Sequence, residues 1–539
     1  MPFSRAAFDR ATLAFLVVLT LATAARIYAL IINPLGLYFD EAQYWMWSRS
    51  FDWGYFTKPP MVAWIIAATT TLTGTDTEWA VRLGAPLAHA LAAGGVFALT
   101  RSMYGAWPGF WAGLGWLALP GVFLSSSLVS TDAFLLPLWA LALLAVWQLM
   151  STRAWGWAIA LGVFIGLGVL AKYAMFYFIA CLALAAYWLA PVREALAKGR
   201  GVAAGVVAAI IVAPNLIWNV QHGFATARHT ASNASFNLDN MFHIGELWEF
   251  LTGQAGVIGP LVYLALIWVL WRAARRSAGL QTEDRFLIAF ILPPLVFVSL
   301  IAFISRANAN WVAVAYPAIM VWVTGSLFTS KRGRRVLAAA TALNAVLGFA
   351  TVAYVASAPN SAPRIIKGAR ESSGWEATAR EIARRAAVQP GEPPFTAVMA
   401  DDRATYFELS YYWRHARREA APLPPLRMWV LHGEPANSAE ANDGMRPEEG
   451  GRVLIVHLRP DLTTFVADDF TTFRRVERLS VPIVEDCSNP TDFVAQLYTG
   501  LGGNLRPCTR DFDISVGEGF APAPRDAAFE ARLAGRDEP

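Results

Sequence analysis

The chain has 539 residues, of which 56% are hydrophobic and only 16% are charged, and its formal net charge is +4. Soluble proteins are about 45–50% apolar and about 25% charged, so this composition argues against a soluble enzyme. The small net charge gives no reason to expect nucleic-acid binding. Long runs almost free of charge recur over the first two thirds of the chain, which is typical of a helical membrane protein.

About eleven runs approach the length of about 20 residues that a membrane-spanning helix needs. They lie near residues 11–32, 79–100, 107–124, 132–150, 155–171, 174–190, 201–219, 255–271, 286–304, 309–328 and 336–357. The run 60–73 is shorter and rich in threonine, so we interpret it as an interfacial or re-entrant helix. The first 357 residues are therefore predicted to form a polytopic α-helical membrane domain.

The orientation follows from Lys and Arg, which are concentrated in alternate connecting segments such as 272–276 and 331–335. Such segments face the cytoplasm, which predicts a cytoplasmic N-terminus and an outer loop over 33–78. A signal-peptidase site near Ala24 is the alternative, but the apolar run continues to Ile31 and favours an uncleaved first span.

The outer loop contains the stretch YFDEAQYWMWSRSFDWGYFTKPP over residues 38–60. Carboxylates at a membrane border are costly if buried, so they are usually hydrated or functional. We assign function to Asp40 and Lys58, leave Glu41 open, and interpret Arg49 and Asp52 as scaffolding.

Two later spans carry polar residues at the same predicted face. Asp132 begins a span, where it would either cap the helix or act beside Asp40 as a second carboxylate. Lys172 and Tyr173 end another span; the lysine would either extend to the interface or bind a phosphate.

Two further segments supply candidates at that face. Arg306 lies in a short outer turn, and its planar guanidinium suits phosphate. His222 follows the span 201–219 and could bind a phosphate, a sugar or a metal. A pair formed with His229 is weak evidence for a metal site.

From residue 358 the chain becomes polar, and we predict a soluble α/β domain over 358–515 followed by a loose tail over 516–539. Residues 374–387 and 403–414 are predicted as helices, and 395–400 and 452–458 as buried strands. Cys487 and Cys508 would form a disulfide only if this domain lies outside the cytoplasm, and the spacing alone leaves that open. Cys181 lies in an apolar run and is interpreted as inert packing.

Several catalytic patterns are absent from the sequence. There is no Walker P-loop, HExxH or GxSxG motif. Charged residues of the kind that proton relays place within spans are also absent, which weighs against a coupled transporter.

The motifs DEAQYW, GYFTKPP, STDAF, GLGVLAKY, NLIWNVQHGF, GQAGVIGPL and SRANANW occur in this order. Together they resemble bacterial family-39-type glycosyltransferases of the membrane GT-C fold, including the aminoarabinose and galacturonic acid transferases that modify lipid A and lipopolysaccharide core. The resemblance covers roughly residues 10–360. It implies a sugar donor linked to a polyprenyl phosphate, a lipid A, core or other glycolipid acceptor on the outer side, and inversion at the anomeric carbon.

The resemblance also implies roles for individual residues. Asp40 and Asp132 match the catalytic acidic positions, and Lys58 matches the lysine that binds the donor phosphate, with Tyr55 in the same motif. Thr57 stands where the aminoarabinose transferases have an acidic residue that helps to hold a metal. We therefore assign no metal ligands and leave a divalent metal open. A lipid-linked sugar flippase and a protein O-mannosyltransferase-like enzyme are the alternatives.

Overall fold

The computed structural model describes residues 9–224, 226, 242–275, 279–387, 391–419 and 422–535. The chain divides into two compact units. The first comprises Met1–Ile32 and Phe51–Ala353, and the second comprises Asn33–Ser50 and Tyr354–Pro539. The later division lies close to the predicted boundary after residue 357. Residues 33–50, which were predicted as part of the membrane domain's outer loop, group instead with the C-terminal residues.

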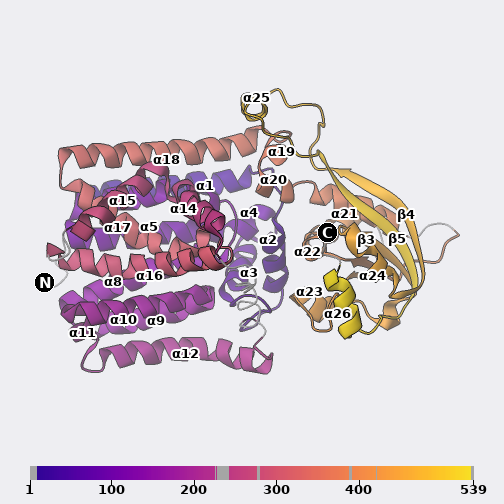
Figure 1. Ribbon diagram of the computed structural model, residues 1–539, viewed down its shortest axis with the longest axis horizontal. Coiled ribbons are helices and arrows are strands. Elements are labelled where there is room, and N and C mark those ends of the chain that lie inside the picture. Colours follow the sequence, from indigo (N-terminus) through magenta and orange to yellow (C-terminus); the bar gives the residue numbers. More distant parts are fainter. Residues whose placement is uncertain are drawn as a thin grey trace. The chain divides into compact units, whose positions relative to one another are not determined.

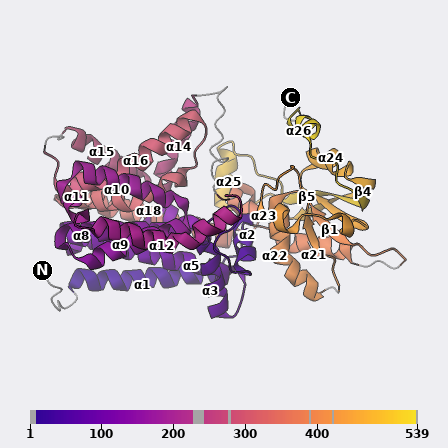
Figure 2. The same ribbon diagram turned by 90° about the horizontal axis from the view of Figure 1, so that it is seen from below.

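The first unit is entirely helical in its described residues, and its long helices run side by side in both views (Figures 1 and 2). Its α-helices are α1 (Arg10–Ile31), α3 (Met61–Thr73), α4 (Glu78–Arg82), α5 (Gly84–Tyr104), α6 (Ala106–Ala118), α7 (Pro120–Ser125), α8 (Thr131–Thr152), α9 (Trp155–Ala171), α10 (Phe176–Trp188), α11 (Ala190–Leu196), α12 (Arg200–Gln221), α14 (Ile244–Ile258), α15 (Pro260–Arg275), α16 (Thr282–Ile304), α17 (Tyr316–Phe328) and α18 (Lys331–Ser357). Two 3₁₀ helices, η1 (Tyr173–Met175) and η3 (Ala309–Ala315), complete it.

Seven helices in the described part of the chain are long and apolar enough to cross a membrane, or up to nine if each of two bent helix pairs counts as one span. All eleven predicted runs are largely helical, but not all are continuous. The helix α9 has 17 residues and α3 has 13, the latter too short to cross a bilayer alone. The chain is thus a multi-pass membrane protein, and the span count of about eleven stays a prediction.

Two predicted spans are interrupted for identifiable backbone reasons. The run 107–124 breaks at Leu119, whose ψ of 132° is extended because Pro120 follows it. The run 255–271 breaks at Gly259, which has a φ of +87° and precedes Pro260. A Cβ at this glycine would lie 1.8 Å from the side-chain oxygen of Asn344, whose Nδ2 donates to the Ile258 carbonyl at 3.0 Å. Only glycine fits both constraints.

The second unit combines short helices with a five-stranded sheet (Figure 2). Its α-helices are α2 (Phe39–Ser48), α19 (Ala362–Ile365), α20 (Lys367–Glu371), α21 (Trp375–Ala386), α22 (Arg403–Glu419), α23 (Ser438–Asp443), α24 (Thr463–Ala467), α25 (Phe493–Gly500) and α26 (Ala527–Ala534). Its strands are β1 (Ala397–Ala400), β2 (Leu426–Met428), β3 (Arg452–His457), β4 (Phe470–Pro482) and β5 (Thr509–Phe520), with 3₁₀ turns η4 (Pro447–Glu449) and η5 (Pro460–Leu462).

The sheet has the strand order β2-β1-β3-β5-β4. Strands β2, β1 and β3 are parallel, whereas β5 is antiparallel to both β3 and β4. The helices α21 and α22 and the strands β1 and β3 confirm the four predicted elements. The long strand β4 was not predicted because most of its residues are exposed and several are charged, so it lacks a buried apolar pattern.

The prediction of a loose tail over 516–539 is wrong for most of the residues that the structure describes there. Residues up to Phe520 complete β5, and α26 follows. Phe529 and Leu533 of α26 lie in the hydrophobic core with Trp429 and Phe465. Asp526 caps the N-terminus of α26, because its side chain accepts a hydrogen bond from the Phe529 amide. Residues 536–539 lie outside the described part.

Candidate active site

Asp40 and Glu41 occupy the first turn of α2, in the second unit, but their environments differ. Glu41 is 1% exposed, and its Oε2 accepts a hydrogen bond from the Tyr38 amide at 2.9 Å. This bond caps the helix and explains Glu41 without a substrate. The Asp40 side chain is 37% exposed, so solvent reaches it. The structure therefore distinguishes two adjacent carboxylates that the sequence could not separate.

The exposed carboxylate of Asp40 has a partner from a distant part of the chain. Its Oδ1 accepts a hydrogen bond from Nη2 of Arg403, the first residue of α22, at 3.1 Å. The Arg403 guanidinium also lies 5.0 Å from the centre of the Phe39 ring. Burial, followed by the charges of Glu371 and Asp40, raises the pKa of Tyr38, so this hydroxyl stays protonated at neutral pH. Asp40 is thus held in a partly charged and partly aromatic setting.

Backbone and aromatic contacts fix the segment 33–50 within the second unit. The Tyr412 hydroxyl accepts a hydrogen bond from the Leu37 amide at 3.0 Å. A Cβ on Gly36 would lie 2.3 Å from that hydroxyl, so the contact requires a glycine there. Further along α2, the Nε1 of Trp47 donates to Ser438 at 3.1 Å, and the Trp45 ring packs edge-on against Tyr411. These contacts determine where Asp40 points.

Lys58 belongs to the first unit, in a loop that is attached to the end of α12. The Trp53 carbonyl accepts a hydrogen bond from Nδ2 of Asn215 at 2.6 Å. The Tyr55 carbonyl accepts one from Thr226 at 2.9 Å, and the Tyr55 amide donates to the Lys58 carbonyl at 3.1 Å. The backbone that carries Lys58 is therefore defined by polar contacts on both sides of Gly54.

Gly54 allows this loop to approach α12 closely. A Cβ at this position would lie 2.4 Å from the Trp218 ring. The same indole stacks on His222, with ring centres 4.0 Å apart, and Nδ1 of His222 lies 2.8 Å from the Trp218 carbonyl oxygen. The predicted site residue His222 is thus part of the surface that supports the loop. His229 lies outside the described residues.

Tyr55 and Tyr173 differ in their surroundings: Tyr55 is a buried residue, and Tyr173 is held by hydrogen bonds to two asparagines of α12. Tyr55 is 7% exposed, and burial raises its pKa to about 12. The Tyr173 hydroxyl donates to Oδ1 of Asn215 and accepts from Nδ2 of Asn219, both at 3.0 Å. Asn215 therefore links Tyr173 to the loop of Lys58 through one side chain. We regard the two buried asparagines of α12 as the supports of this part of the site.

Asp132 and Lys172, 40 residues apart in sequence, form an ion pair. Nζ of Lys172 lies 2.7 Å from Oδ1 of Asp132, and the two side chains are 24% and 14% exposed. The second carboxylate oxygen accepts a hydrogen bond from Nδ2 of Asn310 at 2.9 Å. Ser130, not Asp132, caps α8, so the capping explanation for Asp132 is unnecessary. Side chains from the start of α8, the junction of α9 with η1 and the start of η3 therefore meet at this carboxylate.

Arg306 lies in the segment between α16 and η3 and is exposed to solvent. Asn310, the second residue of η3, is four positions further along the chain and contacts Asp132. Within the first unit, therefore, Lys58, Asp132, Lys172, Tyr173, His222 and Arg306 lie at helix ends or between helices. The contacts of Lys172, Asn310, Tyr173 and Asn215 join these segments to one another.

No metal site is apparent among the residues that the structure describes, since no group of three or more His, Cys, Asp or Glu side chains is arranged to hold an ion. Thr57 is 3% exposed, and a buried neutral hydroxyl is a weaker ligand for a divalent cation than the carboxylate it replaces. The residues at this position do not fit a metal, and we derive no step through one.

Arg403 was missed by sequence reasoning. It follows the buried strand β1 in the segment MADDRATYF, and it lies 363 residues from Asp40. The one available signal was its place just beyond the carboxyl end of a parallel strand, where functional groups often gather. Asn215, Asn219 and Asn310 were visible as polar residues at span ends, but nothing in the sequence identified their partners.

Comparisons with known proteins show what the whole chain is similar to. Residues 57–218 match a family model described as dolichyl-phosphate-mannose-protein mannosyltransferase. The chain is 35% identical over 304 residues to the lipid A galacturonosyltransferase RgtD of Rhizobium johnstonii. That match covers 56% of this chain and 63% of the relative, so it spans less than two thirds of the relative's length.

Solved structures extend the likeness to nearly the whole chain. ArnT from Cupriavidus metallidurans in the apo state has a TM-score of 0.57 at 17% identity, over 94% of this chain and 99% of that one. The same protein bound to undecaprenyl phosphate has a TM-score of 0.58 at 16% identity, over 95% and 99%. At this identity the likeness establishes the fold. Taken with the sequence match, it confirms the resemblance of this chain to GT-C membrane glycosyltransferases of the aminoarabinose and galacturonic acid transferase type.

Proposed function

We propose that the chain is an inverting glycosyltransferase that moves a sugar from a polyprenyl-phosphate donor to an envelope glycolipid. The observation that carries the proposal is the meeting of Asp132, Lys172 and Asn310 at the same helix ends as the anchored loop of Lys58. Such a cluster presents cationic and acidic groups side by side at one membrane face. Phosphate binding and acceptor positioning require that combination.

In the proposed reaction the bond between the anomeric carbon and the donor phosphate breaks as a bond to the acceptor oxygen forms. Lys58 stabilises the departing polyprenyl phosphate, with Arg306 as a second cation. Asp40 takes the proton of an acceptor hydroxyl, and Asp132 orients the acceptor. One displacement needs one base and no covalent intermediate, so the configuration inverts. Where the acceptor is itself a phosphate, Asp40 orients it instead.

Arg403 acts as a positioning residue in this scheme. Its guanidinium donates a hydrogen bond to Oδ1 of Asp40 and so orients that carboxylate. Because Arg403 begins α22, the α/β fold of the second unit contributes to the orientation of the base. Lys172 and Tyr173 serve the same purpose for Asp132 and for the Lys58 loop.

The acceptor is assigned to lipid A, lipopolysaccharide core or another glycolipid. The match to the lipid A galacturonosyltransferase covers 56% of this chain, whereas the match to the protein mannosyltransferase family model covers residues 57–218. A protein acceptor remains the second candidate because of that model. A lipid-linked sugar flippase is disfavoured because the candidate groups gather at one helix end instead of spreading along the helices.

We place the site on the periplasmic side of a bacterial inner membrane. About eleven spans and the Lys/Arg distribution give a cytoplasmic N-terminus and a periplasmic second unit. The disulfide between Cys487 and Cys508 in that unit supports an oxidising compartment. Alkylation of intact cells with a membrane-impermeant reagent, after reduction, should label these two cysteines. Labelling only after cell lysis would reverse the orientation.

The activity is tested by reconstituting the purified chain in liposomes with a polyprenyl-phosphate sugar and lipid A. Mass spectrometry should find lipid A heavier by one sugar residue, with stoichiometric release of polyprenyl phosphate. Parallel liposomes offered an acceptor peptide should give no product. Movement of the donor between leaflets without any glycosylated product would establish the flippase instead.

A further inference from the structure

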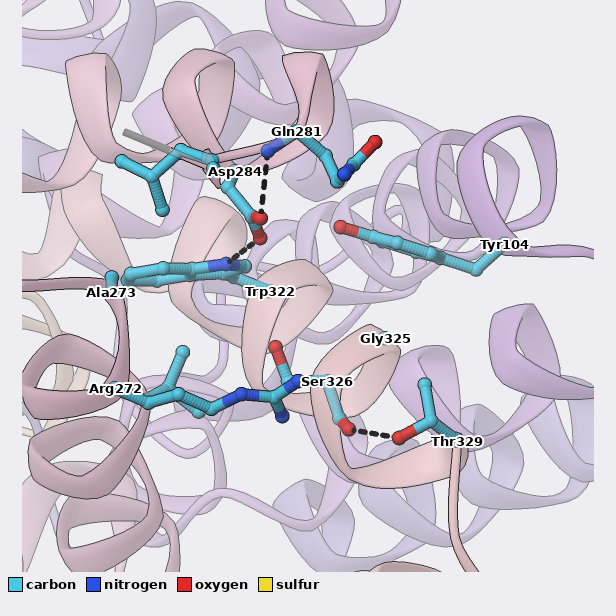
Figure 3. A pocket seen from close by; sticks show the side chains of 12 residues that line it. Tyr104, Arg272, Ala273, Gln281, Asp284, Trp322, Gly325, Ser326 and Thr329 are labelled. Carbon is cyan, nitrogen blue, oxygen red and sulfur yellow. Dashed lines mark hydrogen bonds between the residues drawn. The ribbon is translucent and has the colours of Figure 1, made fainter. Parts of the chain in front are cut away.

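The first unit contains a pocket of about 340 Å³ that the proposed reaction does not use (Figure 3). It is formed where α5, α15 and α17 end and where α16 begins. The polar groups that matter to its chemistry come from Tyr104, Arg272, Gln281, Asp284, Ser326 and Thr329. Trp322 supplies an aromatic wall.

This pocket lies at the opposite end of α16 from the candidate active site. Gln281 and Asp284 stand at the start of α16, whereas Asn310, which contacts Asp132, follows its other end. The helix has 23 residues, which corresponds to about 35 Å at about 1.5 Å per residue. The hydrocarbon core of a bilayer is about 30 Å thick, so the two sites face opposite leaflets.

The walls of the pocket are held by specific contacts. Nε1 of Trp322 donates to Oδ1 of Asp284 at 2.7 Å, and the other carboxylate oxygen accepts from the Gln281 amide at 3.2 Å (Figure 3). Across from them, the Tyr104 ring packs on α17 at Gly325, where a Cβ would lie 2.4 Å from the ring. The two aromatic walls of the pocket, Trp322 and Tyr104, are therefore each fixed by a specific contact.

The charges of the pocket favour an anionic guest. Asp284 already accepts two hydrogen bonds. Among the lining residues that the structure describes, Arg272 is the only cation. Figure 3 shows its guanidinium directed toward Ser326, and the Thr329 hydroxyl donates to the Ser326 carbonyl at 2.9 Å. A guanidinium beside hydroxyl groups in a pocket between helices is suited to a phosphate oxygen.

The surroundings distinguish a lipid from a soluble phosphate. Large apolar side chains of α15 are exposed along the helix that supplies Arg272, at Leu264, Ile267, Trp268 and Trp271. They provide an apolar surface for acyl chains on the same helix that supplies Arg272 to the pocket. Basic residues also follow α17, over 331–335. Anionic headgroups collect at basic pockets between spans near the cytoplasmic leaflet.

We propose that this pocket binds the phosphodiester headgroup of an anionic phospholipid in the leaflet opposite the candidate active site. Arg272 pairs with the phosphate, and Ser326 and Tyr104 are available to the glycerol or headgroup hydroxyls. The volume lies within the range of about 300–1,000 Å³ that is usual for ligand sites. This site is independent of the glycosyl transfer reaction and of the identity of its acceptor.

The test measures lipid binding to the delipidated full-length chain in detergent. Short-chain phosphatidylglycerol should bind to the wild type, and phosphatidylcholine of the same chain length should bind far more weakly. Arg272→Gln should weaken phosphatidylglycerol binding about tenfold, as expected for the loss of one charge-assisted contact. The matched control is Arg275→Gln, because Arg275 lies one turn away, stacks 4.2 Å from the Trp271 ring centre and does not line the pocket.

A second variant removes space instead of charge. Ser326→Leu should also weaken binding, and size-exclusion chromatography of each variant checks that it is folded. Equal losses in Arg272→Gln and Arg275→Gln would overturn the proposal in favour of unspecific surface attraction. Equal binding of both lipids, or unchanged binding in Arg272→Gln, would overturn it as well. Glycerol 3-phosphate binding as tightly as the lipid would assign the pocket to a soluble phosphate.

Discussion

The two units of this protein hold their candidate residues in different ways. In the first unit, polar side chains from different helices meet at the helix ends, as Asp132, Lys172 and Asn310 do. In the second unit, Asp40 stands on the short helix α2, which packs among aromatic and hydroxyl side chains of α22 and α23. The first arrangement depends on which helices are neighbours, and the second on how residues 33–50 pack against α22 and α23 of the C-terminal part.

This difference shows that the motif DEAQYW…TKPP is not one structural element. The chain divides between Ser50 and Phe51, so Asp40 belongs to the second unit and Lys58 to the first. The C-terminal residues are therefore part of the framework that positions a candidate base. Substitutions in each unit of the full-length chain test this difference, and the residues with the largest expected effects come first.

Asp40→Asn should have the largest effect. Loss of a general base costs about 10²–10⁴-fold in rate, and the amide keeps the size of the side chain. The measurement is sugar transfer in liposomes at saturating donor. Asp52→Asn is the matched control, because Asp52 lies in the same stretch and its carboxylate accepts a bond from the adjacent Trp53 amide. Normal turnover in Asp40→Asn would remove the second unit from the chemistry.

Lys58→Met should reduce transfer by about 10²–10³-fold, since a cation that stabilises the leaving phosphate acts mainly on the transition state. The loss should appear in kcat as well as in donor binding. Lys198→Met is the control, because Lys198 lies between α11 and α12 at the opposite end of the helices. Equal losses in the two variants would indicate a general need for charge at the membrane surface.

The pair Asp132–Lys172 calls for a double-mutant cycle with Asp132→Asn and Lys172→Met. The two side chains are mostly buried and 2.7 Å apart, so we expect a coupling energy of about 0.5–3 kcal/mol in kcat/KM. Additive effects would mean that the two residues act separately. The coupling should be absent when Asp132→Asn is combined with Lys198→Met, because Lys198 lies between α11 and α12 and does not contact this ion pair.

Arg403→Gln should have the smallest effect, about 3–10-fold, because the pair with Asp40 is about one third exposed and solvent screens it. A positioning role predicts partial recovery in Arg403→Lys and a shifted pH profile of kcat. The control is Arg380→Gln, since Arg380 forms an exposed pair with Glu376 on the same unit. Identical pH profiles for the wild type and Arg403→Gln would exclude positioning.

Local sequence patterns predicted much of the fold. Apolar runs predicted the helices of the first unit, and periodicity predicted α21, α22, β1 and β3. The breaks at Leu119 and Gly259 could have been anticipated from the prolines that follow them. The exposed strand β4 and the terminal helix α26 could not, because a charged strand and a short helix bury too few side chains to leave a pattern.

For the candidate site, the sequence by itself determined which residue types stand at helix ends and in what order, because charge is excluded from spans and remains at their borders. It could not determine their partners. Lys172 and Asp132 are 40 positions apart in the sequence. Asn215, which supports the Lys58 loop, is 162 positions from its partner Trp53, and Arg403 is 363 positions from Asp40. Only tertiary packing decides such contacts, since they depend on which surfaces are buried together and not on local periodicity.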